Sequence, residues 1–187
     1  MVKKLFWLSI VLLFAVNVSN AQTEAPKHAD EIMKAAYKEA KAADKNIFLI
    51  FHATWCGWCK RLEKAMHSNE LKKIFEDNFV IVHLDVDERG EKIKEFENPG
   101  GKELMAKLGG EKSGLPFYAF LTSAGAKLSD SNVMENNQNI GYPGSKEEIE
   151  AFTKLLSGAS IKLDENQIEA VTDYLVQNAP KPAPAAH

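Results

Sequence analysis

The two cysteines of the chain, Cys56 and Cys59, stand in the segment FHATWCGWCK. Two residues between cysteines suit a redox dithiol, half of a zinc site, or a small structural disulfide. A disulfide across so short a loop removes little entropy from the unfolded chain, so it would stabilise the fold only weakly. Zinc would need two more ligands, and His52 and His67 are not expected to converge with both cysteines on one ion. The spacing therefore favours a redox dithiol and no metal site.

The elements on either side of the cysteines predict different roles for the two sulfurs. The apolar run Ile47 to Phe51 indicates a strand buried on both faces, and a helix is expected from Cys56 to about Met66. A cysteine in the first helical turn faces free backbone N–H groups and the positive end of the helix dipole, which lowers the thiol pKa. We therefore expect Cys56 to be the sulfur that attacks the disulfide of a protein substrate, or client. Cys59, one turn later on the buried face, is placed to resolve the mixed disulfide that Cys56 forms.

Three neighbours of the cysteines are expected to contact the client protein. Gly57 has no side chain and lets a client chain approach the sulfur of Cys56. Trp55 and Trp58 flank the pair and offer an apolar surface around Cys56.

The rest of the chain alternates helices and strands, which predicts an α/β fold with a central sheet covered on both faces. Expected elements are a helix from the N-cap Asp30 to about Ala42, a strand 80–86, a helix 102–108, a strand 117–121, a short strand near Ile140, a helix opened by a capping box of Ser145 and Glu148, and a last helix from Asp164 that buries Ile168, Val171 and Leu175. The cysteines then lie at the C-terminal end of the first strand, where open α/β sheets place their sites.

The stretch ATWCGWCK after a buried strand, together with GLPFYAFL further on, resembles the thioredoxin superfamily. The similarity extends from about Ile32 to Leu156 and is strongest to exported members with the motif WCGWCK. It implies a thioredoxin-like fold, a central mixed β-sheet flanked by helices, here with an additional C-terminal helix. By position, Pro116 corresponds to the family's cis-proline opposite the dithiol, which leaves the backbone of Leu115 free to pair with a client strand. Gly141 corresponds to the family's glycine beside the same groove.

The chain departs from the family pattern near the dithiol. The family often has a buried acid six residues before the first cysteine, which accepts the proton of the second cysteine, and this position is Ile50 here. The lysine that often partners the acid corresponds to His83, so His83 is a candidate proton relay; the alternative is a hydrogen-bonded core histidine. Trp58 replaces the proline that is common before the second cysteine, so the redox potential cannot be inherited from the family.

The N-terminal residues have the pattern of a signal peptide. Lys3 and Lys4 precede an apolar run from Leu5 to Val18, and small residues lead to Ala21, after which we expect cleavage. An uncleaved membrane anchor is the alternative, although the run is shorter than a spanning helix requires. The predicted organisation is a signal peptide 1–21, a thioredoxin-like domain 22–160, an appended amphipathic helix 161–178 and a Pro/Ala-rich tail 179–187.

The predicted function is reduction of disulfides in exported client proteins by a monomeric thioredoxin-like reductase. Its redox group would be the Cys56–Cys59 pair, with no further cofactor, and the resemblance implies a membrane thiol reductase that supplies electrons. Cleavage removes two lysines and no acid, which changes the net charge from −3 to −5 and argues against nucleic acid as a partner. The alternatives are a binding module or holdase without redox turnover, and a disulfide oxidase.

Overall fold

The computed structural model describes residues 25–180. The predicted signal peptide 1–21 and all but the first two residues of the predicted tail 179–187 lie outside the described residues. No helix within 25–180 is long and apolar enough to cross a membrane.

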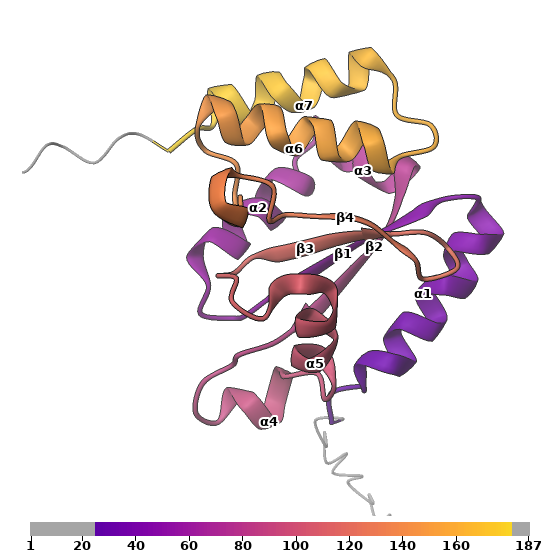
Figure 1. Ribbon diagram of the computed structural model, residues 1–187, viewed down its shortest axis with the longest axis vertical. Coiled ribbons are helices and arrows are strands. Elements are labelled where there is room, and N and C mark those ends of the chain that lie inside the picture. The colour runs from indigo at the N-terminus through magenta and orange to yellow at the C-terminus, as the bar shows by residue number, and fades with distance from the viewer. Residues whose placement is uncertain (1–24, 181–187) are drawn as a thin grey trace, which may run out of the picture.

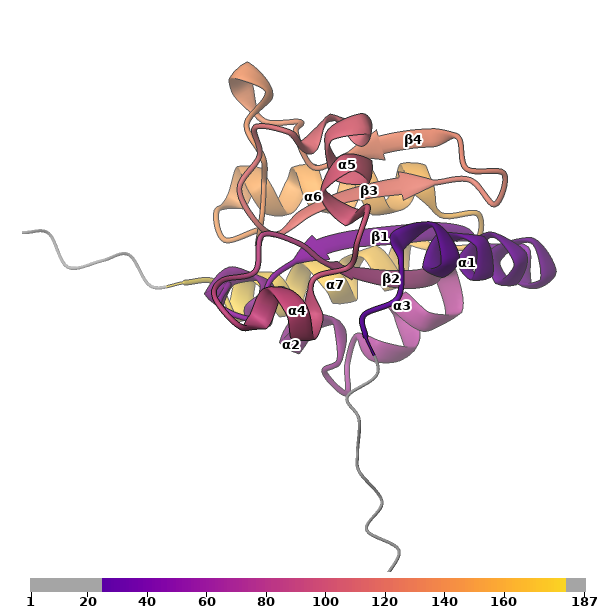
Figure 2. The ribbon, with the colours of Figure 1, turned by 90° about the horizontal axis from the view of Figure 1, so that it is seen from below.

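The centre of the molecule is a mixed sheet of four strands, in the order β2-β1-β3-β4 (Figure 2). The strands are β1 (Asn46–His52), β2 (Phe79–Asp85), β3 (Phe117–Leu121) and β4 (Lys127–Asp130). Strand β1 runs parallel to β2 and antiparallel to β3, and β4 pairs antiparallel with β3. The predicted α/β class and the central mixed sheet are confirmed.

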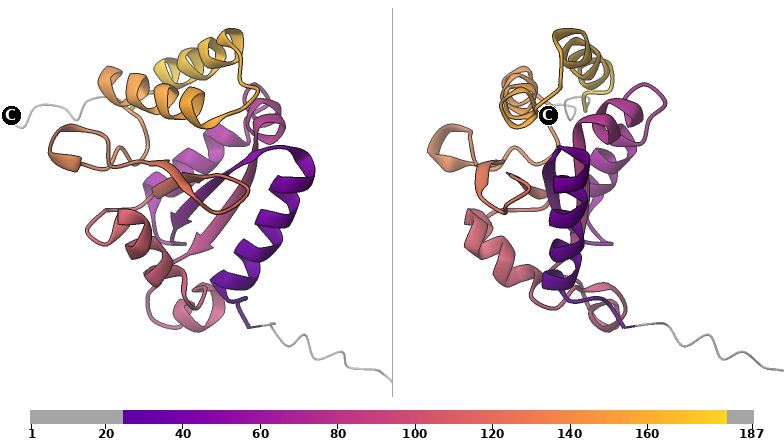
Figure 3. Two further views of the ribbon diagram at one scale, coloured as in Figure 1. Left: turned by 45° about the vertical axis from the view of Figure 1, so that its right-hand side comes forward. Right: turned by 90° about the vertical axis from the view of Figure 1, so that its right-hand side faces the viewer.

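Helices cover both faces of this sheet, as Figures 1 and 3 show. Helix α1 (Ala29–Ala43), helix α5 (Gly101–Met105) and the π-helical turn that continues it (Ala106–Gly110) lie on one face. Helices α2 (Gly57–Met66), α3 (Lys72–Asn78), α6 (Lys146–Ala159) and α7 (Glu165–Gln177) lie on the other. The short helix α4 (Lys92–Phe96) follows β2, and a 3-10 turn (Glu135–Asn137) precedes α6.

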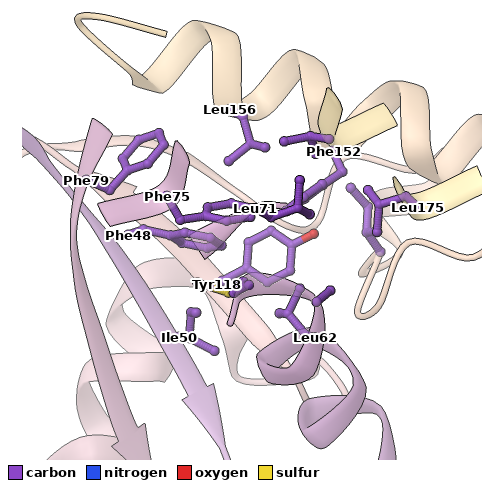
Figure 4. Packing of buried hydrophobic residues seen from close by; sticks show 14 of the residues in the cluster. Phe48, Ile50, Leu62, Leu71, Phe75, Phe79, Tyr118, Phe152, Leu156 and Leu175 are labelled. Carbon is purple, nitrogen blue, oxygen red and sulfur yellow. The ribbon is translucent and has the colours of Figure 1, made fainter. Parts of the chain in front are cut away.

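Alternate residues of β1 feed two separate hydrophobic cores. Ile47, Leu49 and Phe51 are buried against α1 and α5. Phe48 and Ile50 point to the opposite face, into a larger cluster that Figure 4 shows with aromatic side chains from β2, β3, α3 and α6. A strand that is buried on both faces must be apolar at every position, which explains the continuous run in the sequence.

Helix α7 is part of the larger core rather than a separate appendage. Val171 and Leu175 are fully buried in it, as predicted, and Ile168 packs against it partly buried. The predicted capping box of Ser145 with Glu148 is present at α6, and Asp164, where the last helix was expected to begin, forms a second capping box with Gln167 at α7. The boundary predicted between residues 160 and 161 therefore separates chain segments that share one core.

Two expectations about the elements were wrong. Residue Ile140 forms no strand; it is buried, and its N–H donates to Ser131 O. The fourth strand is β4 instead, ten residues earlier. Helix α1 is capped by the side chain of His28, which accepts from the N–H of Asp30, so Asp30 itself lies in the first turn. The expected helix 102–108 is present: the short α-helix α5 continues as a π-helical turn, in which Gly109 has a φ of 102°.

Candidate functional site

The dithiol lies where β1 ends and α2 begins. Cys56 is the N-cap of α2, and its Sγ accepts a hydrogen bond from the backbone N–H of Cys59 at 3.1 Å. The two sulfurs are joined in a disulfide, with the Cα atoms 5.3 Å apart. The predicted positions at the start of the helix and one turn later are confirmed, and in this oxidised form both side chains are almost fully buried.

A hydrogen-bonded carboxylate fixes the turn that leads to the cysteines. Glu88, itself buried, accepts hydrogen bonds from the backbone N–H and from the hydroxyl of Thr54. Its own backbone N–H donates to Glu97 Oε2 at 2.8 Å. Because Glu88 follows β2, its bonds to Thr54 connect the segment after β2 with the turn after β1. The sequence analysis missed this contact because nothing in the spacing of Thr54 and Glu88 indicates it.

The predicted loop opposite the cysteines is present. The Leu115–Pro116 peptide bond is cis, and Leu115 packs against Ala53, Cys56 and Cys59. Gly141 has a φ of 62°, and a Cβ built on it would lie 3.9 Å from Pro116 Cδ. The fold therefore places Leu115 against the dithiol and Gly141 beside Pro116.

Asn139 holds this loop in place, a role that the sequence analysis did not assign. Its Nδ2 donates to the carbonyls of Gly114, at 2.7 Å, and of Pro116, at 3.0 Å. These two hydrogen bonds hold the loop at the residues before and after Leu115. Within residues 25–180 no hydrogen bond engages the backbone of Leu115, which leaves it available to a client strand.

The two tryptophans that flank the cysteines are exposed, Trp55 by 42% and Trp58 by 51%. Trp58 stacks on Tyr142, with ring centroids 6.1 Å apart and 19° between the planes. Trp55 donates from Nε1 to the carbonyl of Asp87 at 2.8 Å, and the guanidinium of Arg89 lies 3.7 Å from its ring centroid. Both indoles are thus held in fixed positions at the surface.

A large open groove runs from Trp58 along the cis-proline loop. Its volume is about 1250 Å³, and its lining includes Leu115, Gly141, Tyr142 and the polar segment 136–139. Pro180 lines the same groove, at the end of the chain that follows α7. An open groove of this size, beside a disulfide and an unpaired stretch of backbone, can hold an extended segment of another chain.

A second, smaller cavity of about 410 Å³ lies on the other side of α2. Cys59 lines it together with His52, Thr54, Lys60 and Glu63, and with residues of α4. His52 ends β1, and its Nε2 lies 3.5 Å from Asp85 Oδ1 at the end of β2. Burial raises the pKa of Asp85, and the nearby His52 partly offsets that shift.

His83, the predicted relay candidate, is paired with Ile50 across β1 and β2 and does not line the cavity beside Cys59. Its ring lies against that of His52, with centroids 5.2 Å apart and 74° between the planes. Burial, with repulsion from His52, lowers the pKa of His83 from 6.5 to about 4. His83 is therefore neutral at physiological pH.

Residues 25–180 bring together no group of three or more histidine, cysteine or acidic side chains that could hold a metal ion. His67 ends α2, where its Nδ1 lies 2.9 Å from the carbonyl of Glu63.

Comparison with known proteins places the chain in a family. The family described as Thioredoxin-like matches residues 30–123, slightly more than half of the chain. Human thioredoxin is 36% identical over 97 residues, which cover 40% of this chain and 90% of the human protein. A candidate protein disulfide-isomerase of Schizosaccharomyces pombe is 33% identical over 95 residues, which cover 50% of this chain and 18% of that protein.

Among solved structures, a disulphide isomerase from Xylella fastidiosa is 18% identical, with a TM-score of 0.47. The alignment covers 80% of this chain and 90% of the isomerase chain. The chain spans less than a fifth of the length of some curated relatives, 14% of an uncharacterized protein of Caenorhabditis elegans and 18% of the Schizosaccharomyces pombe protein. The family match covers β1, the Cys56–Cys59 pair, the cis-proline loop and β3. The chain therefore belongs to the thioredoxin-like family.

Proposed function

We propose that the protein is a thiol–disulfide oxidoreductase that reduces disulfides in exported client proteins. The observation that carries the proposal is the Cys56–Cys59 disulfide at the N-terminus of α2, packed against Leu115 and next to an open groove. The similarity to human thioredoxin and to the Schizosaccharomyces pombe disulfide-isomerase candidate supports disulfide exchange chemistry. Export and a membrane thiol reductase as electron donor belong to the proposal and rest on the N-terminal sequence pattern and on the family resemblance.

We assign a role to each part of the site. In the reduced protein, the N–H groups at the start of α2 stabilise a thiolate on Cys56, which attacks one sulfur of the client disulfide. The client lies in the groove, and its backbone pairs with the free backbone of Leu115. Trp58 and Tyr142 contact its side chains.

The second half of the reaction belongs to Cys59. It loses its proton and attacks Cys56, which releases the client as a dithiol and leaves the Cys56–Cys59 disulfide. The client disulfide gains two electrons and the protein dithiol loses two. A further dithiol must then reduce the protein, which is the role proposed for the membrane partner.

The small size of the segment between β2 and β3 supports reduction over oxidation. Exported oxidases that resemble this family usually carry a large helical insertion, whereas residues 86–116 hold only the five-residue helices α4 and α5 and a π-helical turn. Direction depends on the redox potential, which the loop residues Gly57 and Trp58 tune through the stability of the Cys56 thiolate.

Two measurements test the proposal. Equilibration with glutathione gives the potential of the Cys56–Cys59 pair; a reductase is expected below about −200 mV, whereas a value near about −120 mV would indicate an oxidase. Turnover with a model disulfide protein should disappear in Cys56→Ser, and Cys59→Ser should accumulate mixed disulfides with clients. Wild-type turnover in both variants would overturn the redox function, and client binding by the wild-type protein without any turnover would leave the holdase.

A further inference from the structure

The proton of Cys59 needs an acceptor that differs from the family's buried acid. Cys59 is 4% exposed, so bulk water reaches its sulfur poorly. The position where the family often has an acid is Ile50, buried in the apolar core between β1 and α2. A thiol must become a thiolate before it can attack a disulfide. The acceptor must therefore come from another part of the site.

Strand alternation places His52 on the correct face of the sheet. Side chains two residues apart on a strand point to the same side, so His52 lies on the side of β1 that Phe48 and Ile50 bury beneath α2. It is two residues, about 7 Å, nearer the cysteine end of the strand than Ile50. His52 lines the cavity that Cys59 also lines, and about 410 Å³ is ample room for water between the two side chains.

Asp85 gives this histidine the partner that a proton acceptor needs. His52 and Asp85 are register partners at the ends of β1 and β2, and the carboxylate lies 3.5 Å from Nε2. Within residues 25–180 the buried Nε2 has no hydrogen-bond partner. A carboxylate beside an imidazole fixes the ring and stabilises the imidazolium that forms when the ring takes a proton.

Charged groups from several elements surround the ring of His52. Asp85 and His83 face it from β2, and the second of these is neutral at physiological pH. Around the cavity, Lys60 and Glu63 come from α2 and Lys92 from α4, while Glu88 is bound to the neighbouring Thr54. The one carboxylate within 4 Å of the imidazole in the described chain is that of Asp85.

We propose that His52, oriented by Asp85, accepts the proton of Cys59 through water in their shared cavity and so replaces the acid that is absent at Ile50. The inference rests on the proposed disulfide reduction. The S–H bond of Cys59 breaks, and its proton moves to the imidazole of His52. The thiolate forms the S–S bond with Cys56 while the bond from Cys56 to the client sulfur breaks. The client leaves as a thiolate and takes the proton back from the imidazolium, so two electrons pass from the dithiol to the client.

The test separates the two chemical steps with dithiobis(nitrobenzoate) as the disulfide. Reduced protein releases a first thionitrobenzoate when Cys56 attacks and a second when Cys59 attacks the mixed disulfide. Thionitrobenzoate is a good leaving group, so the second phase reports the deprotonation of Cys59. In His52→Gln and His52→Asn this phase is expected to be about 100-fold slower at neutral pH and to rise in proportion to hydroxide. Asp85→Asn, which removes the carboxylate beside Nε2, should slow the second phase and change the shape of its pH–rate profile.

Controls distinguish failure of this inference from failure of the proposed function. His83→Gln, a matched change on the same sheet face, should keep the wild-type profile. The first phase shows that Cys56 is folded and reactive, and it should be unchanged in every variant. A normal second phase and profile in both His52 variants would overturn the relay and leave the reductase proposal intact. If the wild-type protein showed no first phase, the reductase proposal itself would fail.

Discussion

Arg61 of α2 donates a hydrogen bond from its guanidinium to the backbone carbonyl of Asn178, which follows the last turn of α7, at 3.0 Å. The same guanidinium lies 5.2 Å from the ring centroid of Tyr142 and 5.9 Å from that of Trp58. Tyr142 also donates to the carbonyl of Asn178, at 3.4 Å. The C-terminal helix is thereby connected to the aromatic wall of the groove beside the dithiol.

Replacement of Arg61 by alanine should impair client binding without affecting the cysteines. Loss of the guanidinium frees the stacked pair Trp58 and Tyr142 and removes the link to Asn178. We expect KM for a protein disulfide to rise several-fold, with an unchanged rate of reaction with dithiobis(nitrobenzoate), and stability to fall by about 1 kcal/mol. Lys64→Ala, an exposed change one turn along α2, is the control. Equal losses for the large and the small disulfide would contradict a role in the groove.

Helix α7 should contribute strongly to the stability of the whole domain. Leu175 is 1% exposed and packs in the core between α6, α7 and the sheet (Figure 4), whereas its neighbour Val176 is 58% exposed. Leu175→Ala should cost about 2–5 kcal/mol in the free energy of unfolding. Val176→Ala should change it by less than about 0.5 kcal/mol. Urea denaturation, followed by tryptophan fluorescence, measures the free energy of unfolding of both variants. A change as small in Leu175→Ala as in Val176→Ala would mean that the packing of α7 contributes little to stability.

The hydroxyl of Tyr118 should destabilise the protein. Tyr118 is fully buried in the larger core, where Figure 4 shows its oxygen directed toward Leu175, and within residues 25–180 the hydroxyl has no hydrogen-bond partner. Burial, and to a lesser degree Glu148, raises its pKa well above 10.0. Tyr118→Phe should therefore raise the free energy of unfolding by about 1 kcal/mol. A loss of the same size in calorimetry would show that the hydroxyl is hydrogen-bonded in solution.

His83 should make the protein less stable in acid. Its pKa is about 4 in the folded protein, below the 6.5 of an exposed imidazole, so the unfolded chain binds the proton more tightly. The stabilisation is fully present above pH 6.5 and disappears as the pH falls toward 4. The wild-type protein should lose about 3 kcal/mol more than His83→Gln across this interval.

Urea titrations at the two ends of the interval measure the difference between the proteins. Asp85, whose pKa is raised by burial, contributes with the opposite sign and is present in both, so it cancels in the comparison. Parallel pH dependences of wild type and variant would show that His83 is not the buried neutral base described above.

The strongly patterned elements were predictable from sequence because burial and chemistry leave a local signal. The apolar run before Cys56, the capping residues of α6 and α7 and the Leu115–Pro116 loop all appear where expected. Strand β4 was missed because it is an edge strand with exposed and half-buried residues, fixed by pairing with β3 and not by hydrophobicity. A strand was expected near Ile140 because this residue is apolar. Ile140 is indeed buried, but it lies in a loop and forms no strand.

The parts of the site that depend on contacts between distant segments could not be predicted. The bonds from Asn139 to the cis-proline loop and from Glu88 to Thr54 join residues more than twenty positions apart that carry no shared motif. The position of His52 was recoverable, because strand alternation from Ile50 puts it on the same face. The family's lysine corresponds to His83 and not to His52, so the family resemblance alone does not point to His52.

The position of Pro180 limits where a tag or fusion partner can be attached to the protein. It packs so closely that a Cβ on Gly144 would lie 2.9 Å from its Cδ, and it lines the groove proposed for clients. A purification tag or fluorescent fusion joined directly after Pro180 would start beside the groove and compete with any added peptide. Attachment before α1, at the opposite end of the molecule in Figure 1, leaves the groove clear for binding assays.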